Sequence, residues 1–139
     1  MKELNHLSRP PIVAIVDDDE AIRDALSELL MLEGFACRSF ERASGFLAEA
    51  GTGTFDCLLT DVRMPGMSGL DLLEHLNGLD LHLPTIVLTS VVDERSHARS
   101  VALGACAWLC KPIADEVLLR ELRSAIRGMD GLFSQGSGE

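Results

Sequence analysis

Four groups of polar residues each follow directly on a short apolar run, and their side chains are of types that handle phosphoryl groups. They are Asp17-Asp18-Asp19, Asp61, Thr89-Ser90 and Lys111-Pro112. Carboxylates held within a few ångströms repel one another and raise each other's pKa, so they favour a divalent cation with oxygen ligands. Mg²⁺ commonly takes one or two carboxylates together with waters, and it keeps positions for a phosphate. A lysine on the other side would neutralise charge on a transferring phosphoryl group, so the four groups predict phosphoryl-transfer chemistry.

The acceptor of such a group is predicted to be the protein itself. The sequence has no G-x-x-x-x-G-K-[ST] phosphate loop, so a bound nucleotide is not expected. A carboxylate can accept a phosphoryl group as an acyl phosphate, and Asp61 stands alone after its apolar run, which makes it the best nucleophile. Asp17 and Asp18 are then predicted to hold the metal, and Asp19 to cap the helix that follows.

One framework must bring these groups together, and the chain alternates short apolar runs with amphipathic stretches. The predicted strands are Pro11–Val16, Ala36–Phe40, Phe55–Thr60, Thr85–Thr89 and Cys106–Cys110, and the predicted helices are Glu20–Glu33, Ser44–Ala50, Gly69–Asn77, Glu94–Leu103 and Ala114–Arg127. Gly34, Gly78 and Gly104 are predicted to end three of the helices, and Asp93 to cap one of them. Three runs (IVAIV, CLLT and IVLT) are apolar almost throughout, as in parallel strands covered on both faces. The pattern predicts an α/β domain with a parallel sheet, whose strands end at a common functional edge.

The bulk composition narrows the classes of protein. A net charge of −10 over 139 residues, with no clustered basic patch, argues against nucleic-acid binding by this chain. No run approaches the roughly 18 apolar residues that span a bilayer, and none forms a signal-peptide core, so we expect a cytoplasmic protein with no membrane contact. The four cysteines lie in or beside apolar runs and are predicted to be buried free thiols. Cys106 and Cys110 form a C-x3-C pair, but no second His/Cys pair supports a metal site there.

At the polar groups described above, the chain resembles the receiver domain of bacterial two-component response regulators. The motifs that carry the resemblance are I-V-D-D-D-E at 15–20, T-D-V-R-M-P-G-M-S-G at 60–69, I-V-L-T-S at 86–90 and W-L-C-K-P at 108–112. Each motif is short, but the set in this order and spacing is specific, and the resemblance covers residues 10–127. It implies a flavodoxin-like fold, a (βα)5 doubly wound five-stranded parallel sheet with strand order 2-1-3-4-5.

The resemblance also implies a role for each residue of the site. Asp61 would be the phospho-acceptor, Lys111 would pair with the phosphoryl group and Thr89 would hydrogen-bond to it. The implied ligands of Mg²⁺ (or Mn²⁺) are Asp17, Asp18, Asp61 and the backbone carbonyl of Arg63. The implied switch residues are Thr89 and Trp108, and the implied cis peptide bond joins Lys111 to Pro112.

Two features of the site set further expectations. Trp108 stands where the family more usually has Tyr, Phe or His, and an indole is bulkier and needs a partner for its N–H when buried. Trp108 is therefore either a switch that turns or a fixed core residue. Arg63 and Val91 occupy positions that tune the lifetime of the phosphorylated form in the family. Because Val91 cannot orient a hydrolytic water, slow self-dephosphorylation is expected.

The family's signalling cycle implies the partners. A sensor histidine kinase would donate the phosphoryl group, and the chain would catalyse only its own phosphotransfer and dephosphorylation. The face formed by residues 94–103, 106–110 and 114–127 would then change shape, pairing with a second copy or releasing an output domain, with transcription as the expected output. Two sequence segments, R-M-P-G-M-S-G after Asp61 and G-F-A-C-R-S-F at 34–40, are most similar to those of receivers of the nitrogen-fixation regulator type. Regulators of that type carry a helix-turn-helix output domain.

Two segments lie outside the receiver region in this reading. Residues 1–9 are expected to be an N-terminal extension. Residues 128–139 are rich in Gly and Ser without apolar periodicity, which predicts a frayed tail or the start of a linker. The chain contains no helix-turn-helix domain, so it is interpreted either as a truncated protein or as a stand-alone receiver, and the tail favours the first.

Three other classes of protein share some of these features but fit the sequence less well. A phosphatase of the haloacid-dehalogenase type would use Asp17-x-Asp19, but position 21 is Ala where Thr or Val is expected, and Asp61 would have no role. A flavodoxin-like electron carrier would need a hydroxyl- and Gly-rich phosphate loop after the first strand, and none is present. A degenerate receiver that only binds partners is disfavoured because Asp61, Thr89 and Lys111 are all intact.

Overall fold

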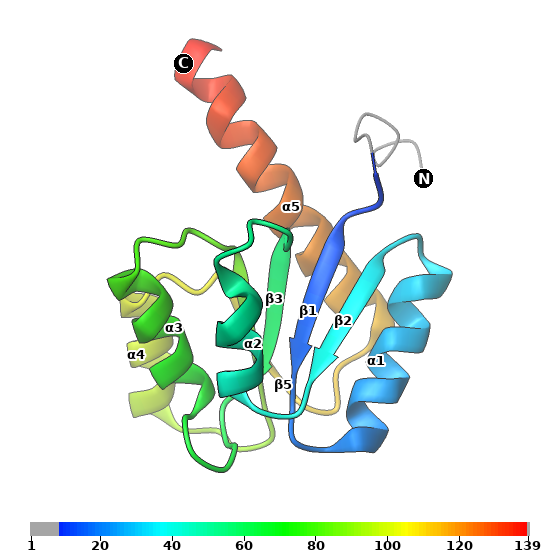
Figure 1. Ribbon diagram of the computed structural model, residues 1–139, viewed down its shortest axis with the longest axis vertical. Helices are drawn as coiled ribbons and strands as arrows, with labels where there is room; N and C mark the ends of the chain where they lie inside the picture. The colour runs from blue at the N-terminus through cyan, green and yellow to red at the C-terminus, as the bar shows by residue number, and fades with distance from the viewer. Residues whose placement is uncertain (1–8, 139) are drawn as a thin grey trace.

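This computed structural model of the protein describes the backbone of residues 9–138 and the side chains of residues 9–128, and shows five strands alternating with five helices (Figure 1). The elements are β1 (Ile12–Val16), α1 (Glu20–Leu32), β2 (Ala36–Phe40), α2 (Ala43–Ala50), β3 (Cys57–Asp61), α3 (Gly69–Gly78), β4 (Thr85–Thr89), α4 (Glu94–Ala102), β5 (Ala107–Cys110) and α5 (Asp115–Gly138). All four strand pairings are parallel, in the order β2-β1-β3-β4-β5. The predicted (βα)5 doubly wound sheet and its strand order are confirmed.

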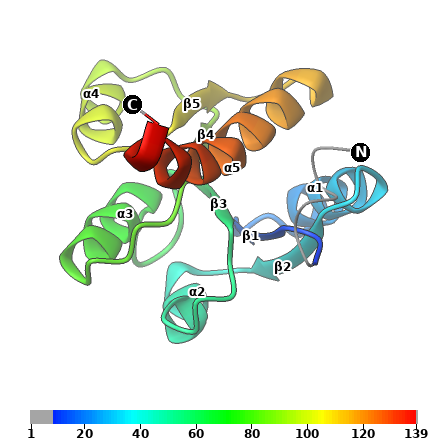
Figure 2. The same ribbon diagram turned by 90° about the horizontal axis from the view of Figure 1, so that it is seen from above.

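Helices cover both faces of the sheet, as Figure 2 shows from above. Successive residues of a strand point to opposite faces, so Val13 and Ile15 of β1 face one layer while Ala14 and Val16 face the other. The first layer contains α1 and α5, whose buried side chains are Leu30, Leu118, Leu119, Leu122, Ala125 and Ile126. The second contains α2 and α3, which contribute Ala43, Phe46, Leu72 and Leu76. The central strands are therefore buried on both sides, as their apolar runs predicted.

β5 differs from the three central strands because it forms one edge of the sheet, while β2 forms the other. Its residues are half-buried or exposed, whereas every residue of β4 beside it is buried. The prediction that all four cysteines are buried is wrong for Cys106 and Cys110, which are exposed before and at the end of this edge strand. Cys57 in the central β3 is fully buried, and Cys37 of β2 is half-buried, where loss of solvent raises the pKa of its thiol to about 11. An apolar run alone does not distinguish an edge strand from a central one.

The helix ends explain where the chain turns back to the sheet. Asp19 caps α1 by accepting hydrogen bonds from the backbone N–H groups of residues 21 and 22, and Asp93 caps α4. Gly34 and Gly104 follow their helices with φ of 95° and 89°, a conformation that glycine adopts without strain. α3 ends at Gly78, as predicted, but Gly78 is the last residue of the helix and the left-handed residue is Asp80, with φ of 59°.

The two ends of the chain depart from the sequence-based expectation. α5 does not fray after Arg127 but continues as a helix to Gly138, extending beyond the sheet (Figure 1). The glycines of this stretch weaken a helix, but the stretch contains no proline, which alone would block the hydrogen-bond ladder. Of the predicted N-terminal extension only Arg9 lies within the described residues, where its guanidinium pairs with Asp56 at 2.7 Å. None of the described helices is long and apolar enough to cross a membrane.

Candidate functional site

Three carboxylates predicted to act together meet at the carboxyl ends of β1 and β3. One oxygen each from Asp17, Asp18 and Asp61 lies within 4.8 Å of the other two. Asp17 is buried, Asp61 is partly buried and Asp18 is exposed. This is the one such acidic or His/Cys cluster among the described side chains. The parallel register places the last residues of neighbouring strands side by side, which is why residues 44 positions apart come together.

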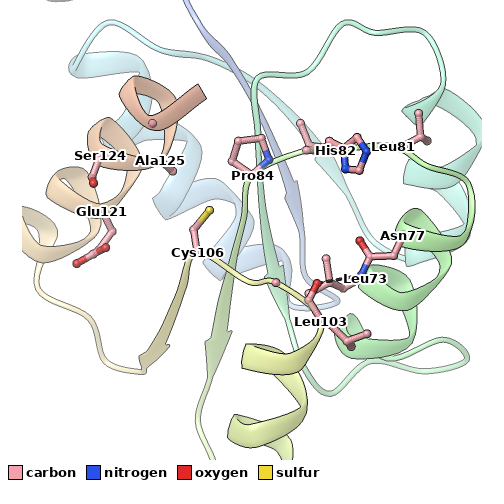
Figure 3. Close-up of a pocket in the computed structure, with 13 residues that line it drawn as sticks. Leu73, Asn77, Leu81, His82, Pro84, Leu103, Cys106, Glu121, Ser124 and Ala125 are labelled. Atoms are coloured by element: carbon pink, nitrogen blue, oxygen red, sulfur yellow. Dashed lines mark hydrogen bonds between the residues drawn. The ribbon is translucent and has the colours of Figure 1, made fainter. Parts of the chain in front are cut away.

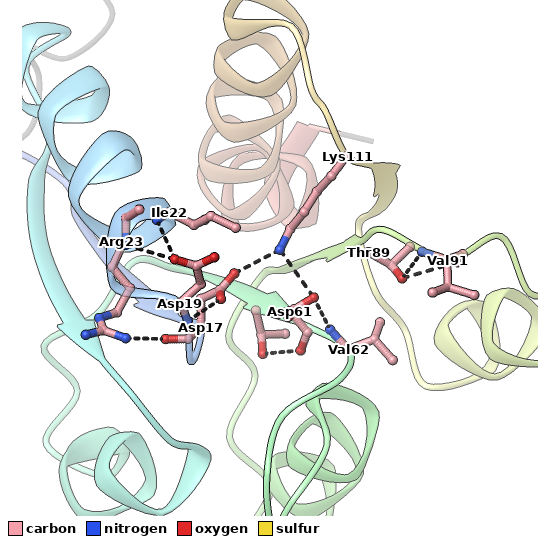
Figure 4. Close-up of polar contacts among 11 residues, drawn as sticks. Asp17, Asp19, Ile22, Arg23, Asp61, Val62, Thr89, Val91 and Lys111 are labelled. Atoms are coloured by element: carbon pink, nitrogen blue, oxygen red, sulfur yellow. Dashed lines mark hydrogen bonds and ion pairs between the residues drawn. The ribbon is translucent and has the colours of Figure 1, made fainter.

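Lys111 reaches from the end of β5 into this cluster (Figure 4). Its Nζ lies 3.0 Å from Oδ2 of Asp17 and 3.4 Å from Oδ1 of Asp61. Burial by itself would lower the pKa of the ammonium group, but the hydrogen bond that it donates to Asp17 and the charge of Asp61 outweigh burial, and the pKa of Lys111 is raised. The lysine is therefore charged and bridges the two strands that carry the carboxylates.

Asp17 is fixed on every side in this structure. Its backbone N–H donates to the carbonyl of Phe40 at 3.1 Å, and its Oδ1 accepts from the N–H of Asp19 at 2.9 Å. Its own carbonyl accepts a hydrogen bond from Nη1 of Arg23 at 2.7 Å. Sequence reasoning missed Arg23, because nothing in the pattern tells a solvated arginine of α1 from one that folds back on the preceding loop. The other carboxylate of the loop, Asp18, has no hydrogen bond or ion pair within the described structure and is free to bind a cation.

Asp61 presents one oxygen to the protein and one to solvent. Oδ1 accepts a hydrogen bond from the N–H of Val62 at 2.9 Å and faces Lys111, whereas Oδ2 has no partner among the described residues. Since no buried side-chain oxygen lacks a partner in the described part of the chain, Oδ2 must reach solvent. Burial raises the pKa of Asp61, Lys111 opposes this rise and the charge of Asp17 adds to it. Burial, helped by the charge of Asp17, thus prevails over the single lysine.

The loop after Asp61 is closed against β3 by a residue without a side chain. The N–H of Gly69 donates to the carbonyl of Val62 at 2.9 Å. A Cβ atom at Gly69 would overlap the carbonyl oxygen of Asp61, so only glycine permits this approach. Ser68 caps α3 in a capping box with Asp71, which fixes the direction of the helix that leaves the site. The S-G-L-D sequence carries the signal for this cap.

The predicted switch residues lie apart from the acidic cluster in this conformation. Thr89 is buried, and its hydroxyl is within hydrogen-bonding distance of both the N–H and the carbonyl of Val91, at 3.1 and 3.2 Å, as Figure 4 shows. Trp108 is half-buried and stacks on His97 of α4, with ring centroids 5.2 Å apart. The peptide bond between Lys111 and Pro112 is cis, the isomer that the resemblance implies. Arg63 lies in the loop after β3 with an exposed side chain.

The charges and donor atoms of the cluster fit a small divalent cation. Three carboxylates less one ammonium leave a formal charge of −2, which a single Mg²⁺ would neutralise. The donors are all oxygens, which Mg²⁺ prefers over nitrogen and sulfur, and one of the carboxylates is exposed and unpaired. The residues present therefore suit the metal that the sequence predicted.

A cavity of about 600 Å³ lies at the other end of the sheet, where β4 and β5 begin (Figure 3). Its wall is mainly apolar, and its polar side chains include Asn77, His82, Cys106 and Glu121. The acidic cluster lies at the opposite, carboxyl ends of the strands, so this cavity is not part of the site. None of its residues belongs to a group that could hold a metal within the described structure.

Comparisons with known proteins agree with this geometry. The sequence model of the response regulator receiver domain matches residues 13–123. The chain is 36% identical over 125 residues to the response regulator protein TodT of Pseudomonas putida, covering 89% of this chain and 55% of TodT. It is 37% identical over 114 residues to the transcriptional regulatory protein FixJ of Azorhizobium caulinodans, covering 82% of this chain and 54% of FixJ.

Solved structures show the same likeness. The crystal structure of a CheY-like response regulator receiver domain protein from Methanospirillum hungatei matches with a TM-score of 0.83 at 28% identity, covering 88% of this chain and 98% of that one. The chain spans about half the length of the curated relatives TodT and FixJ, so the match concerns their receiver part. The chain belongs to the response regulator receiver domain family, whose general function is a phosphorylation-dependent signalling switch.

Proposed function

We propose that Asp61 is the residue that accepts the phosphoryl group, with Asp17, Asp18 and the backbone carbonyl of Arg63 completing a Mg²⁺ (or Mn²⁺) site and Lys111 neutralising charge. The observation that carries this proposal is the position of the Lys111 Nζ between the carboxylates of Asp17 and Asp61, beside a third carboxylate. A metal and a lysine on two sides of one carboxylate is the arrangement that phosphoryl transfer requires.

The transfer begins at the free oxygen of Asp61. Oδ2 attacks phosphorus while Oδ1 stays hydrogen-bonded to Val62, and the bond from phosphorus to the donor's histidine nitrogen breaks as the acyl phosphate forms. Bound Mg²⁺ would stabilise negative charge on the phosphoryl oxygens. Lys111, already beside Asp61, needs only a short movement to pair with the transferred group. A sensor histidine kinase is the proposed donor, since response regulators receive their phosphoryl group from such kinases.

The response starts at Thr89. Its hydroxyl would leave the backbone of Val91 and donate to a phosphoryl oxygen, which opens space toward which Trp108 can turn. The face formed by α4, β5 and α5 then changes shape. We propose that this face pairs with a second copy of the chain or releases an output domain, with transcription as the output, as the names of FixJ and its relatives suggest. This signalling would take place in the cytoplasm.

Loss of the phosphoryl group is proposed to be slow. Val91 has a half-buried apolar side chain, which cannot orient a water for attack on the acyl phosphate. Arg63, the other residue expected to tune this lifetime, has an exposed side chain. Replacing Val91 by Glu would supply a group able to hold water, so the Val91→Glu variant should lose its label faster than wild type.

The geometry disfavours the alternative of a phosphatase built on Asp17 and Asp19. Asp19 accepts two backbone hydrogen bonds at the start of α1, and Asp17 is 1% exposed with both carboxylate oxygens engaged. Asp17 is therefore not available as a nucleophile, and Asp19 is engaged as the cap of α1. Asp61, by contrast, has an oxygen that reaches solvent.

The test is incubation with acetyl phosphate and Mg²⁺ followed by intact-mass measurement. Wild type and Asp24→Asn, which alters an exposed carboxylate of α1, should gain the mass of one phosphoryl group. Asp61→Asn should gain none, and omission of Mg²⁺ should abolish labelling of the other two. A stable adduct on Asp61→Asn, or no adduct on wild type, would refute the assignment.

A further inference from the structure

α4 is attached to the domain differently from the other four helices. Its one buried residue is Ser100, whose hydroxyl donates to the carbonyl of His97 within the same helix. No side chain of α4 belongs to any of the three apolar clusters of the described residues. Apolar burial, which holds the other helices to the sheet, therefore contributes little to the position of this one.

One contact between two aromatic rings joins α4 to β5. The ring of His97 stacks on Trp108 with 5.2 Å between centroids and 19° between planes. Trp108 in turn packs against a small buried cluster of Val62, Leu70 and Val87. An aromatic pair in this geometry adds attraction beyond the area it buries. As long as the pair persists, the indole and the helix are held together.

A second contact, between oppositely charged side chains, joins α4 to α3. Nη2 of Arg99 donates to Oδ1 of Asp71 at 3.0 Å and to Oε1 of Glu74 at 2.9 Å. Asp71 also belongs to the capping box with Ser68, one residue before the glycine that presses on the carbonyl of Asp61. Arg99 thus connects α4 to α3, the helix whose first residue, Gly69, lies against the backbone carbonyl of Asp61.

We propose that His97 and Arg99 are positioning residues that clasp α4 to β5 and α3 in the unphosphorylated domain, and that the strength of this clasp sets how readily the domain adopts its phosphorylated form. The proposal rests on the proposed function, because it concerns the response to a group on Asp61. Contacts that form in only one of two states stabilise that state, and they lower the apparent affinity of any ligand that binds the other state. Loss of the clasp should therefore make binding of a phosphoryl mimic tighter.

The sizes of the effects follow from the kinds of contact. Loss of an aromatic pair corresponds to about a two- to tenfold change in affinity. Loss of an exposed ion pair corresponds to a change of up to about fivefold. The direction is the diagnostic part, since a variant that merely damages the fold would bind the mimic more weakly.

The experiment titrates beryllofluoride in the presence of Mg²⁺ and follows the emission of Trp108, the single tryptophan of the chain. His97→Ala and Arg99→Ala should show lower midpoints than wild type, and Arg99→Lys, which keeps the charge without the planar fork, should lie between. The matched control is Arg95→Ala, which removes the same charge from an exposed position of α4 whose side chain makes no hydrogen bond or ion pair among the described residues.

Amide hydrogen exchange of residues 94–102 without any mimic tests the clasp independently of phosphorylation. Exchange should be faster in His97→Ala and Arg99→Ala than in wild type and Arg95→Ala. Unchanged exchange, or midpoints equal to or higher than that of wild type, would overturn the proposal. If exchange rises as expected but wild type itself shows no response to beryllofluoride, the proposed function fails while the clasp as a structural contact stands.

Discussion

The strands that carry the site differ in how deeply they are buried. β1, β3 and β4 are almost wholly buried, and the two large apolar clusters that surround them contain residues from four helices. At the β5 edge the strand is half-exposed, α4 buries one serine, and the third cluster has three buried members. The carboxylates thus follow strands that are buried on both faces, and we call β1, β3 and β4 with their helices the rigid side. Trp108, the predicted switch residue, lies in the less buried region of β5 and α4, which we call the compliant side. A switch needs both, because a metal site requires ligands at fixed positions and a signalling surface must be able to change its conformation.

The largest expected effect tests the rigid side directly. Leu58 of β3 is fully buried, so Leu58→Ala should lower the free energy of unfolding by about 2–5 kcal/mol. Val101 of α4 is 64% exposed, and Val101→Ala should stay within about 0.5 kcal/mol of wild type. Urea unfolding of the two variants measures the contrast. Similar losses at both sites would mean that α4 is as firmly packed as the central strands.

The next effect concerns the close approach of the loop to Asp61. Gly69→Ala forces the new methyl group into a backbone carbonyl and should cost about 1–3 kcal/mol of unfolding free energy. Gly78, at the other end of the same helix, has open space around the position of a Cβ atom. Gly78→Ala should therefore be neutral or stabilising by up to about 1 kcal/mol. Thermal melts of both variants compare the two ends of α3 under identical conditions.

A third effect comes from charge within the rigid site. A raised pKa means that the folded state holds the proton of Asp61 more tightly than the unfolded state, so the ionised carboxylate destabilises the fold at neutral pH. Asp61→Asn should stabilise the metal-free protein by about 1 kcal/mol or less, since solvent screens a partly exposed group. The gain should shrink as the pH falls through the raised pKa toward the ordinary value of 3.8.

Without metal, Asp61→Asn is expected to be more stable than wild type, and addition of Mg²⁺ should reverse this order of stabilities. Mg²⁺ binds the native carboxylates and raises the melting temperature of wild type more than that of Asp61→Asn. Asp24→Asn serves as the control for the loss of one negative charge, and its response to Mg²⁺ should match that of wild type. Equal stabilisation of all three proteins would place the metal elsewhere.

The smallest expected effect lies on the compliant side. Hydrogen bonds from Arg99 and Ser68 lower the pKa of Asp71, so this carboxylate contributes stability above the ordinary value of 3.8 and loses it as the pH falls through the lowered pKa. Arg99→Ala should cost between about 0 and 1 kcal/mol at pH 7, because the pair is exposed. As the pH falls below the lowered pKa of Asp71, the melting temperature of Arg99→Ala should approach that of Arg95→Ala. A difference that does not depend on pH would indicate a packing role for Arg99.

Sequence reasoning predicted the rigid side well and the compliant side poorly, and the reason is physical. Buried parallel strands need apolar runs, and those runs end at a shared edge, so the positions of Asp17, Asp61 and Lys111 followed from the pattern. Contacts such as His97 with Trp108 join exposed positions of separate elements, and no periodicity records them. The continuation of α5 past Arg127 was missed because glycines lower helix propensity without preventing the helix.

The Lys111 bridge gives the resting domain a counter-ion of its own. Because the ammonium group already sits between Asp17 and Asp61, the site is partly neutralised before any metal arrives. A phosphoryl group on Asp61 would add negative charge to this site, so the lysine alone would not balance the phosphorylated state. On the proposed function, phosphorylation of Asp61 would therefore require both the divalent cation and the upstream kinase.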